Sequence, residues 1–176
     1  YENTTLATNT SSLSITAISS AAENNKSRVI GMHFFNPATV MKLVEIIKGD
    51  FTSDETLKTA VGITKKLGKT PVICKDTPGF IVNRVARPFY GESLKILGEG
   101  GLSVEQIDNI MKDEGGFRMG PFELMDLIGI DVNLSVTKSV YEALNHNPKY
   151  KPHPIQEKMV ESGNLGRKTG GGFYKY

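Results

Sequence analysis

The stretch from Met32 to Ile47 places the strongest constraint on what this chain can fold into. Two short apolar runs, rich in β-branched and aromatic residues, flank residues 36–40, which begin with the turn-forming pair Asn-Pro. Such runs are typical of strands, and we expect one over residues 28–35 and the other over 41–47. The connection is too short for a parallel crossover, so the two strands are predicted to be antiparallel neighbours.

Each of these strands contains one residue that does not suit an apolar run. His33 lies in the first and Glu45 in the second, at equal distances in sequence from Thr39. In an antiparallel pair centred on Thr39 they face each other, with Cβ atoms roughly 5 Å apart. A carboxylate so placed can hold an imidazole by a hydrogen bond and raise its basicity. The alternative is a structural strand histidine beside a solvated glutamate.

Composition limits the classes of protein that this chain can represent. Its 176 residues suit one ordinary domain or two small ones, and no apolar run approaches a membrane span. A net charge of +2 gives no reason to expect nucleic acid or an anionic membrane as a partner. The single cysteine, Cys74, rules out an internal disulfide and a cysteine-based zinc site, and the three histidines lack metal-ligand spacing. We therefore expect no metal site.

The start of the chain predicts a strand followed by a helix. Residues 5–8 suit a short strand, and Ser11 or Ser12 is positioned to cap a helix over residues 13–22. A hydroxyl at a strand-to-helix junction often faces a ligand, so Ser11 can serve both roles.

A second helix is expected after the two central strands. Thr52 or Ser53 caps it, acidic residues fill its first turn, and it runs to Leu67 and ends at Gly68. Residues 70–74 then suit another strand. Strand, helix and strand in this order indicate the end of an α/β domain.

The segment Asp76-Thr77-Pro78-Gly79 is the clearest boundary, and the sequence after it predicts helices only. The expected helices cover residues 80–97, 103–111, 122–129, 131–144 and 155–162. Pro88 is expected to bend the first of them. Asn83 lies in its first turn, beside the boundary where a cleft is expected, although helix-end hydrogen bonding would also explain an asparagine there. Lys168 belongs to a basic, glycine-rich tail.

Several motifs, in order along the chain, resemble those of the L-3-hydroxyacyl-CoA dehydrogenases. They are Asn9-Thr10-Ser11-Ser12-Leu13, His33-Phe34-Phe35-Asn36-Pro37, Met41-Lys42-Leu43-Val44-Glu45, Asp76 through Arg84, Met119 through Leu124, and Gly170-x-Gly172-Phe173-Tyr174. The resemblance covers essentially the whole chain. It is strongest to the single-function members, including the 3-hydroxybutyryl-CoA dehydrogenases.

The resemblance implies the end of a Rossmann-type NAD-binding domain over residues 1–76 and an all-helical domain that dimerises over residues 77–176. NAD is the implied cofactor, with NADP not excluded, and an acyl-CoA thioester is the implied substrate. The family's glycine fingerprint would fall upstream of Tyr1, so this chain resembles a fragment that is inactive alone. The implied location is the bacterial cytoplasm or the mitochondrial matrix, without secretion.

The resemblance also implies roles for individual residues. His33 matches the general base and Glu45 the carboxylate that orients it. Ser11, with Ser12 as the alternative, and Asn83 match the groups around the reacting oxygen. The positions near the nicotinamide end of the cofactor correspond to Asn9, Asn36 and Lys168.

Two other functions remain open on sequence grounds. One is a non-catalytic dimerisation or structural module of the same fold, against which the intact His33, Glu45 and Asn83 argue. The other is a related β-hydroxyacid dehydrogenase, but such enzymes usually rely on a catalytic lysine in the helical domain, and the sequence offers no comparable candidate.

Overall fold

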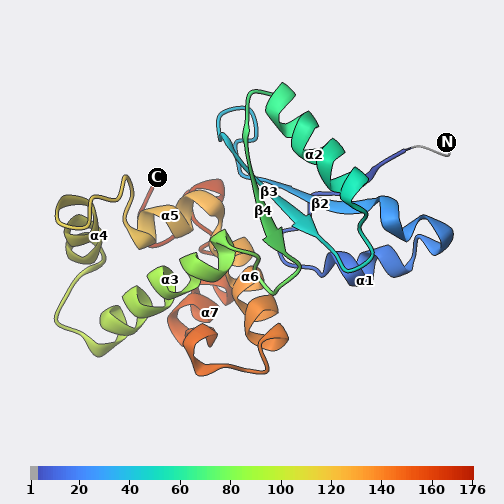
Figure 1. Ribbon diagram of the computed structural model, residues 1–176. Helices are drawn as coiled ribbons and strands as arrows, with labels where there is room; N and C mark the ends of the chain where they lie inside the picture. The colour runs from blue at the N-terminus through green and yellow to red at the C-terminus, as the bar shows by residue number, and fades with distance from the viewer. Residues whose placement is uncertain (1–3) are drawn as a thin grey trace. The chain divides into compact units, whose positions relative to one another are not determined.

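A computed structural model describes residues 4–176, and its internal contacts divide the chain into two compact units (Figure 1). The first ends at Arg84 and the second begins at Val85. Each unit has its own secondary structure and its own core.

The first unit is a four-stranded sheet in the order β1-β2-β3-β4. The strands are β1 (Leu6–Thr8), β2 (Val29–Phe34), β3 (Leu43–Lys48) and β4 (Thr70–Lys75). Strand β2 is parallel to β1 and antiparallel to β3, and β3 is parallel to β4. The antiparallel pairing of the two central strands is therefore confirmed, and so is the register that places His33 opposite Glu45.

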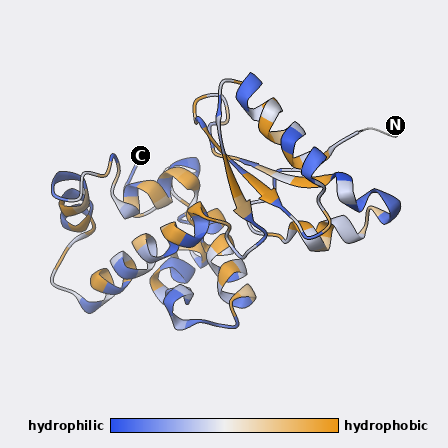
Figure 2. Cartoon of the chain, in the orientation of Figure 1, coloured by the Kyte–Doolittle hydropathy of each residue, from blue (hydrophilic) through white to orange (hydrophobic). Residues whose placement is uncertain are grey.

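Side chains alternate between the two faces of this sheet, and a helix covers each face. Helix α2 (Asp54–Lys66), which joins β3 to β4, packs through Ala60 on one face. Helix α1 (Ile15–Ser20), which follows β1, packs through Ile15 on the other, together with Phe80. The strands contribute most of the apolar residues of this core (Figure 2). His33 and Glu45 point to the same face as α1 and Phe80, because they alternate with the residues that face α2.

Gly31 explains how α1 comes so close to β2. A Cβ atom at this position would lie 2.8 Å from Ile15 Cδ1 and 2.8 Å from Ile47 Cβ, closer than atoms can approach. Glycine therefore allows Ile15 to pack directly on β2. Gly31 and His33 are two positions apart on this strand, so both face α1.

The predicted start of α1 was wrong. Its cap is Ser14, whose Oγ accepts a hydrogen bond from the Ala17 amide at 3.2 Å, and not Ser11 or Ser12. The carboxylate of Asp76 accepts hydrogen bonds from the first amides of the helix and from the Ser14 hydroxyl. A group from a distant part of the sequence thus determines where the helix begins, and local spacing could not show it.

The start and end of α2 follow the sequence more closely. Ser53 is the cap and accepts a hydrogen bond from the Thr56 amide at 3.1 Å. Gly68, with φ +70°, directly follows Leu67, the C-cap of α2, as expected for a glycine that ends a helix.

The second unit is built from helices. They are α3 (Val82–Glu99), whose first residues belong to the first unit, α4 (Val104–Asp113), α5 (Pro121–Ile128), α6 (Ile130–Ala143) and α7 (Pro154–Glu161). Two isolated bridges, Gly166–Gly171 and Gly171–Lys175, are the β-type pairings here within residues 4–176. The prediction of a helical second half is confirmed.

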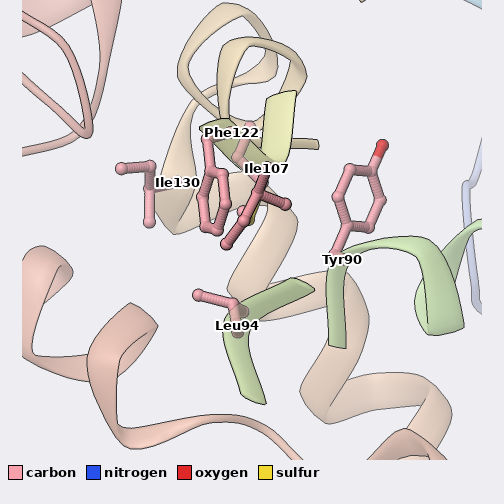
Figure 3. Close-up of a cluster of buried hydrophobic side chains, with 6 residues drawn as sticks. Tyr90, Leu94, Ile107, Phe122 and Ile130 are labelled. Atoms are coloured by element: carbon pink, nitrogen blue, oxygen red, sulfur yellow. The ribbon is translucent and has the colours of Figure 1, made fainter. Parts of the chain in front are cut away.

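A cluster of large apolar side chains from several helices forms the core of this unit. Figure 3 shows Phe122 of α5 beside Ile107 of α4, with Leu94 and Tyr90 of α3 and Ile130 of α6 around them. None of these five side chains is more than 4% exposed. The helices are thus held by apolar burial, which is the main stabilising contribution available to a small helical unit.

Two buried carboxylates fix the ends of segments in this unit. Asp108 accepts hydrogen bonds from the Phe122 and Glu123 amides, each at 2.9 Å, and from the Tyr174 hydroxyl at 2.8 Å. Asp126 accepts hydrogen bonds from the amides of Phe173 (3.0 Å) and Tyr174 (2.9 Å). The first carboxylate holds the start of α5, and both anchor the C-terminal tail.

Candidate active site

His33 and Glu45 form a buried pair on neighbouring strands. His33 Nδ1 lies 2.7 Å from Glu45 Oε2; His33 is 5% exposed and Glu45 is fully buried. Burial by itself would raise the pKa of Glu45, but hydrogen bonds from His33 and from the Val82 and Ile81 amides outweigh it and lower the pKa. An ionised carboxylate only accepts hydrogen bonds, so Nδ1 carries the hydrogen and Nε2 is the basic nitrogen.

The second oxygen of Glu45 holds the start of α3. Glu45 Oε1 accepts hydrogen bonds from the Ile81 and Val82 amides, both at 2.9 Å. Amides at the start of a helix lack partners within the helix, and a carboxylate there is favourable. One glutamate therefore orients the imidazole and also fixes the helix that carries Asn83.

The structure brings Asn83 and Ser11 together. Asn83 Nδ2 donates a hydrogen bond to the backbone oxygen of Ser11 at 3.1 Å, although the two residues lie 72 positions apart. Ser11 is half-buried and is not the cap of α1, since that role belongs to Ser14. The contact places the Ser11 segment beside the helix start that Glu45 holds.

Asn9 and Asn36 lie at one edge of the sheet. Strands β1 and β2 are parallel, so their carboxyl ends meet there; Asn9 directly follows β1 and Asn36 follows β2 by two residues. Asn9 Oδ1 accepts a hydrogen bond from the Phe34 amide at 2.8 Å, and Asn36 is exposed. Dinucleotides bind at the carboxyl ends of parallel strands, and these side-chain amides suit the carboxamide of a nicotinamide.

The loop that carries Asn36 is held by hydrogen bonds from a lysine, which the sequence did not predict. Lys69 Nζ donates hydrogen bonds to the backbone oxygens of Ala38 (2.5 Å) and Met41 (2.8 Å), and the Asn36–Pro37 peptide is cis. A lysine that directly follows a helix-ending glycine is usually exposed to solvent, so the local sequence did not predict this contact.

Lys168 belongs to the second unit and has a partner there. Its Nζ lies 2.6 and 2.7 Å from the two oxygens of Asp131, in the first turn of α6. This ion pair lowers the pKa of Asp131.

Two aromatic rings flank His33, and sequence reasoning assigned a role to neither. Ring centroids of Phe35 and Phe80 lie 4.5 and 6.0 Å from that of His33. Phe80 follows the Thr-Pro-Gly turn directly, which was the only signal in the sequence that its backbone is unusual.

Across residues 4–176 there is no group of three or more histidine, cysteine, aspartate or glutamate side chains that could hold a metal ion. In the same residues no helix is both long and apolar enough to cross a membrane.

The first unit carries its two asparagines at the carboxyl ends of parallel strands, which is where dinucleotides bind in α/β folds. Comparison with known families makes this specific. Residues 1–77 match the model of the 3-hydroxyacyl-CoA dehydrogenase NAD binding domain, and residues 79–176 match that of the 3-hydroxyacyl-CoA dehydrogenase C-terminal domain. The chain belongs to the 3-hydroxyacyl-CoA dehydrogenase family.

Individual relatives agree with this assignment. The chain is 47% identical to human mitochondrial hydroxyacyl-coenzyme A dehydrogenase, over 99% of this chain and 55% of that protein. It is 50% identical to 3-hydroxyadipyl-CoA dehydrogenase of Escherichia coli, over 98% of this chain and 36% of that protein. The crystal structure of (S)-3-hydroxybutyryl-CoA dehydrogenase from Ralstonia eutropha matches with a TM-score of 0.94 at 46% identity, over 100% of this chain and 62% of that one. The chain spans about half the length of the curated relatives it matches.

Proposed function

We propose that the protein containing this chain interconverts L-3-hydroxyacyl-CoA and 3-ketoacyl-CoA with NAD as the cofactor. The observation that carries the proposal is the buried pair of His33 and Glu45, 2.7 Å apart, in a chain of this family. In this proposal residues 1–76 are the end of the NAD-binding domain, and residues 77–176 are the helical domain.

His33 acts as the general base in this proposal. Oxidation of a secondary alcohol requires the hydroxyl proton to leave as a hydride leaves the carbon; NAD, when bound, supplies the hydride acceptor. His33 Nε2 takes the proton, and Glu45, already ionised and hydrogen-bonded to Nδ1, stabilises the imidazolium that forms. In the reverse direction His33 returns the proton to the oxygen.

Ser11 and Asn83 are proposed to hold the reacting oxygen, with Ser12 as the alternative to Ser11. A hydroxyl and an amide can each donate a hydrogen bond to an oxygen as negative charge develops on it. The contact between Asn83 Nδ2 and the Ser11 backbone oxygen supports a common location for the two residues.

Asn9, Asn36 and Lys168 are proposed to lie near the nicotinamide end of the cofactor. The position of both asparagines at the carboxyl ends of parallel strands supports this for the first two. For Lys168 the support is the resemblance alone, and its ion pair with Asp131 would have to open or be shared for direct contact with a ligand.

We also propose a homodimer that forms through the helical unit. Exposed apolar side chains on that unit support it: Val85, Leu127 and Val132 are each about half exposed or more. The proposed location is the bacterial cytoplasm or the mitochondrial matrix, since the relatives include a human mitochondrial protein and one from Escherichia coli.

The test measures acetoacetyl-CoA-dependent NADH oxidation by this chain and by the full-length product of the gene, side by side. We expect activity in the full-length product only, and a fall in kcat of about 10²- to 10⁴-fold when His33→Gln removes the base. Dimerisation should survive that substitution. Unchanged activity in His33→Gln would refute the role of His33, and a folded but inactive full-length dimer would favour the non-catalytic module.

A further inference from the structure

Phe80 has a backbone conformation that is rare for a bulky side chain. Its φ is +48°, in the left-handed region, and it follows Gly79 with φ +72°. A non-glycine residue with an aromatic side chain adopts this conformation only when the surrounding structure enforces it, and such residues cluster at functional sites. Glycine would take the same conformation with little strain, so the ring must contribute packing that offsets the strain.

The ring of Phe80 lies against the catalytic histidine of the proposed mechanism. Phe80 is 3% exposed and packs in the core cluster of Ile15, Val29 and Ile47. Its ring centroid is 6.0 Å from that of His33, with the rings tilted at 59°. A side chain held in a close-packed core can restrict the orientation of a ring that touches it.

The backbone conformation of Phe80 directs the two amides that follow it toward Glu45. The turn is closed by a hydrogen bond from the Phe80 amide to the Thr77 oxygen at 2.9 Å. Directly after the left-handed residue, the amides of Ile81 and Val82 both point to Glu45 Oε1. Successive amides in a turn of this kind form a concave site for an anion, which here is the carboxylate of the protein itself.

We propose that Phe80 is a positioning residue for the pair formed by His33 and Glu45. Its ring fixes the orientation of the imidazole, and its left-handed backbone aims two amides at the carboxylate. The inference rests on the proposed function, because it assigns Phe80 to the step in which His33 moves the proton. In this role Phe80 acts through the pair and does not itself transfer the proton.

The first experiment measures kcat and KM of the full-length protein for Phe80→Leu and Phe80→Gly. Leucine keeps an apolar side chain but not the ring, and glycine keeps the turn but no side chain. We expect kcat to fall by about 10- to 100-fold in both, because displacement of a catalytic group by about 1 Å can reduce the rate 100-fold. KM for acetoacetyl-CoA should change by less than about 3-fold, because the loss of an interaction made only in the transition state lowers kcat and leaves KM unchanged.

Phe51→Leu is the matched control, since Phe51 is 48% exposed in the same unit. It should keep the wild-type kcat. Phe80→Ala tests the backbone separately. If residue 80 keeps its left-handed conformation, the Gly variant should have a higher Tm than the Ala variant, although Ala retains one more carbon.

An NMR measurement makes the inference independent of turnover. In full-length protein with ¹⁵N-labelled histidine, the Nδ1–H of His33 bound to Glu45 should give a downfield proton resonance, assigned by its loss in His33→Gln. We expect it to be retained in Phe51→Leu and to shift or broaden in Phe80→Leu.

The outcomes separate the two proposals. If the wild type is active and Phe80→Leu changes neither kcat nor the resonance, Phe80 has no positioning role. If kcat and Tm fall but the resonance stays unchanged, the role of Phe80 is structural only, and the inference is overturned. If the wild type is inactive and the resonance still shifts in Phe80→Leu, the proposed function fails while the positioning of the pair stands. The decision rests on Phe80→Leu alone if Phe80→Gly does not fold.

Discussion

The sheet unit and the helical unit both use a buried carboxylate to hold backbone amides, but only one of these carboxylates has an imidazole as its other partner. Glu45 binds the Ile81 and Val82 amides through one oxygen and His33 through the other. Asp126 binds two amides of the tail, and its further partner is the Tyr176 hydroxyl at 3.1 Å. An imidazole can accept a proton on a ring nitrogen, which suits the general-base role proposed for His33, whereas the Tyr176 phenol adds one more hydrogen bond to the anchor of the tail.

The partners of each carboxylate also decide the direction of its pKa. Burial and the neighbouring Glu123 raise the pKa of Asp108, and the hydrogen bonds from two amides and Tyr174 do not offset them. For Asp76 burial acts in the same sense, but hydrogen bonds from Thr16, Ile15 and Ser14 outweigh it and lower the pKa. A fall in pH therefore reduces the contribution of Asp76 to the stability of the folded state and increases that of Asp108.

The largest expected effect tests whether Glu45 differs from Asp126 in function. Glu45→Gln in the full-length protein should lower kcat by about 10²- to 10⁴-fold, because the amide no longer stabilises an imidazolium at His33. The matched variant Asp126→Asn should leave kcat per folded molecule within about 3-fold of wild type. Equal losses in both variants would remove the distinction between the two carboxylates.

The next effect is on stability and belongs to the helical unit. Asp126→Ala removes the acceptor for the Phe173 and Tyr174 amides and should lower the free energy of unfolding by about 3 kcal/mol, since bonds to a charged group contribute about 1.5–3 kcal/mol each. The measurement is urea unfolding followed by circular dichroism. Asp113→Ala, at an exposed residue on α4, should stay within about 0.5 kcal/mol of wild type. A small loss in Asp126→Ala would mean that the tail is held by apolar packing instead.

The third prediction compares how the free energy of unfolding depends on pH at one carboxylate of each unit, Asp76 and Asp108. The folded pKa of Asp76 is lowered, so its stabilisation is complete above the unfolded value of about 3.9 and is lost as pH falls through the folded value. The stability advantage of wild type over Asp76→Asn should therefore shrink below about pH 4.

For Asp108 the sign reverses. Its folded pKa is raised, so its contribution is complete below the unfolded value of about 3.9 and is lost as pH rises through the folded value. The free energy of unfolding of wild type minus that of Asp108→Asn should fall with rising pH, whereas the corresponding difference for Asp76→Asn should rise. Parallel pH profiles for the two differences would contradict the assigned directions.

The smallest expected effect concerns Cys74, which lies in the sheet unit and is the only cysteine of the chain. Burial, followed by the nearby charges of Glu45 and Asp76, raises the pKa of its thiol to about 12. Iodoacetamide should therefore label the folded chain very slowly at pH 8 and the urea-unfolded chain quickly. The labelling rate then reports opening of the sheet unit alone; rapid labelling in the absence of urea would show that this unit opens readily.

The main outline of the fold could be predicted because its signals are local. Two apolar runs around the Asn-Pro turn predicted the hairpin, and the equal distances of His33 and Glu45 from Thr39 predicted its register, which the structure confirms. Of the two caps predicted for α2, Thr52 and Ser53, the structure has Ser53. These features depend on residues within four positions of each other or across one short turn.

The start of α1 and the surroundings of the histidine depended on contacts that no local pattern contains. Asp76 binds the Ile15 amide across 61 positions, and Glu45 binds the Ile81 amide across 36. By itself the sequence determined the strands, the approximate extent of the helices and the opposition of histidine and glutamate, because apolar runs and turn residues are properties of neighbouring positions. Only the tertiary structure decided which distant carboxylate meets which amide and that Phe80 lies against His33, because such partners are chosen by the packing of whole elements.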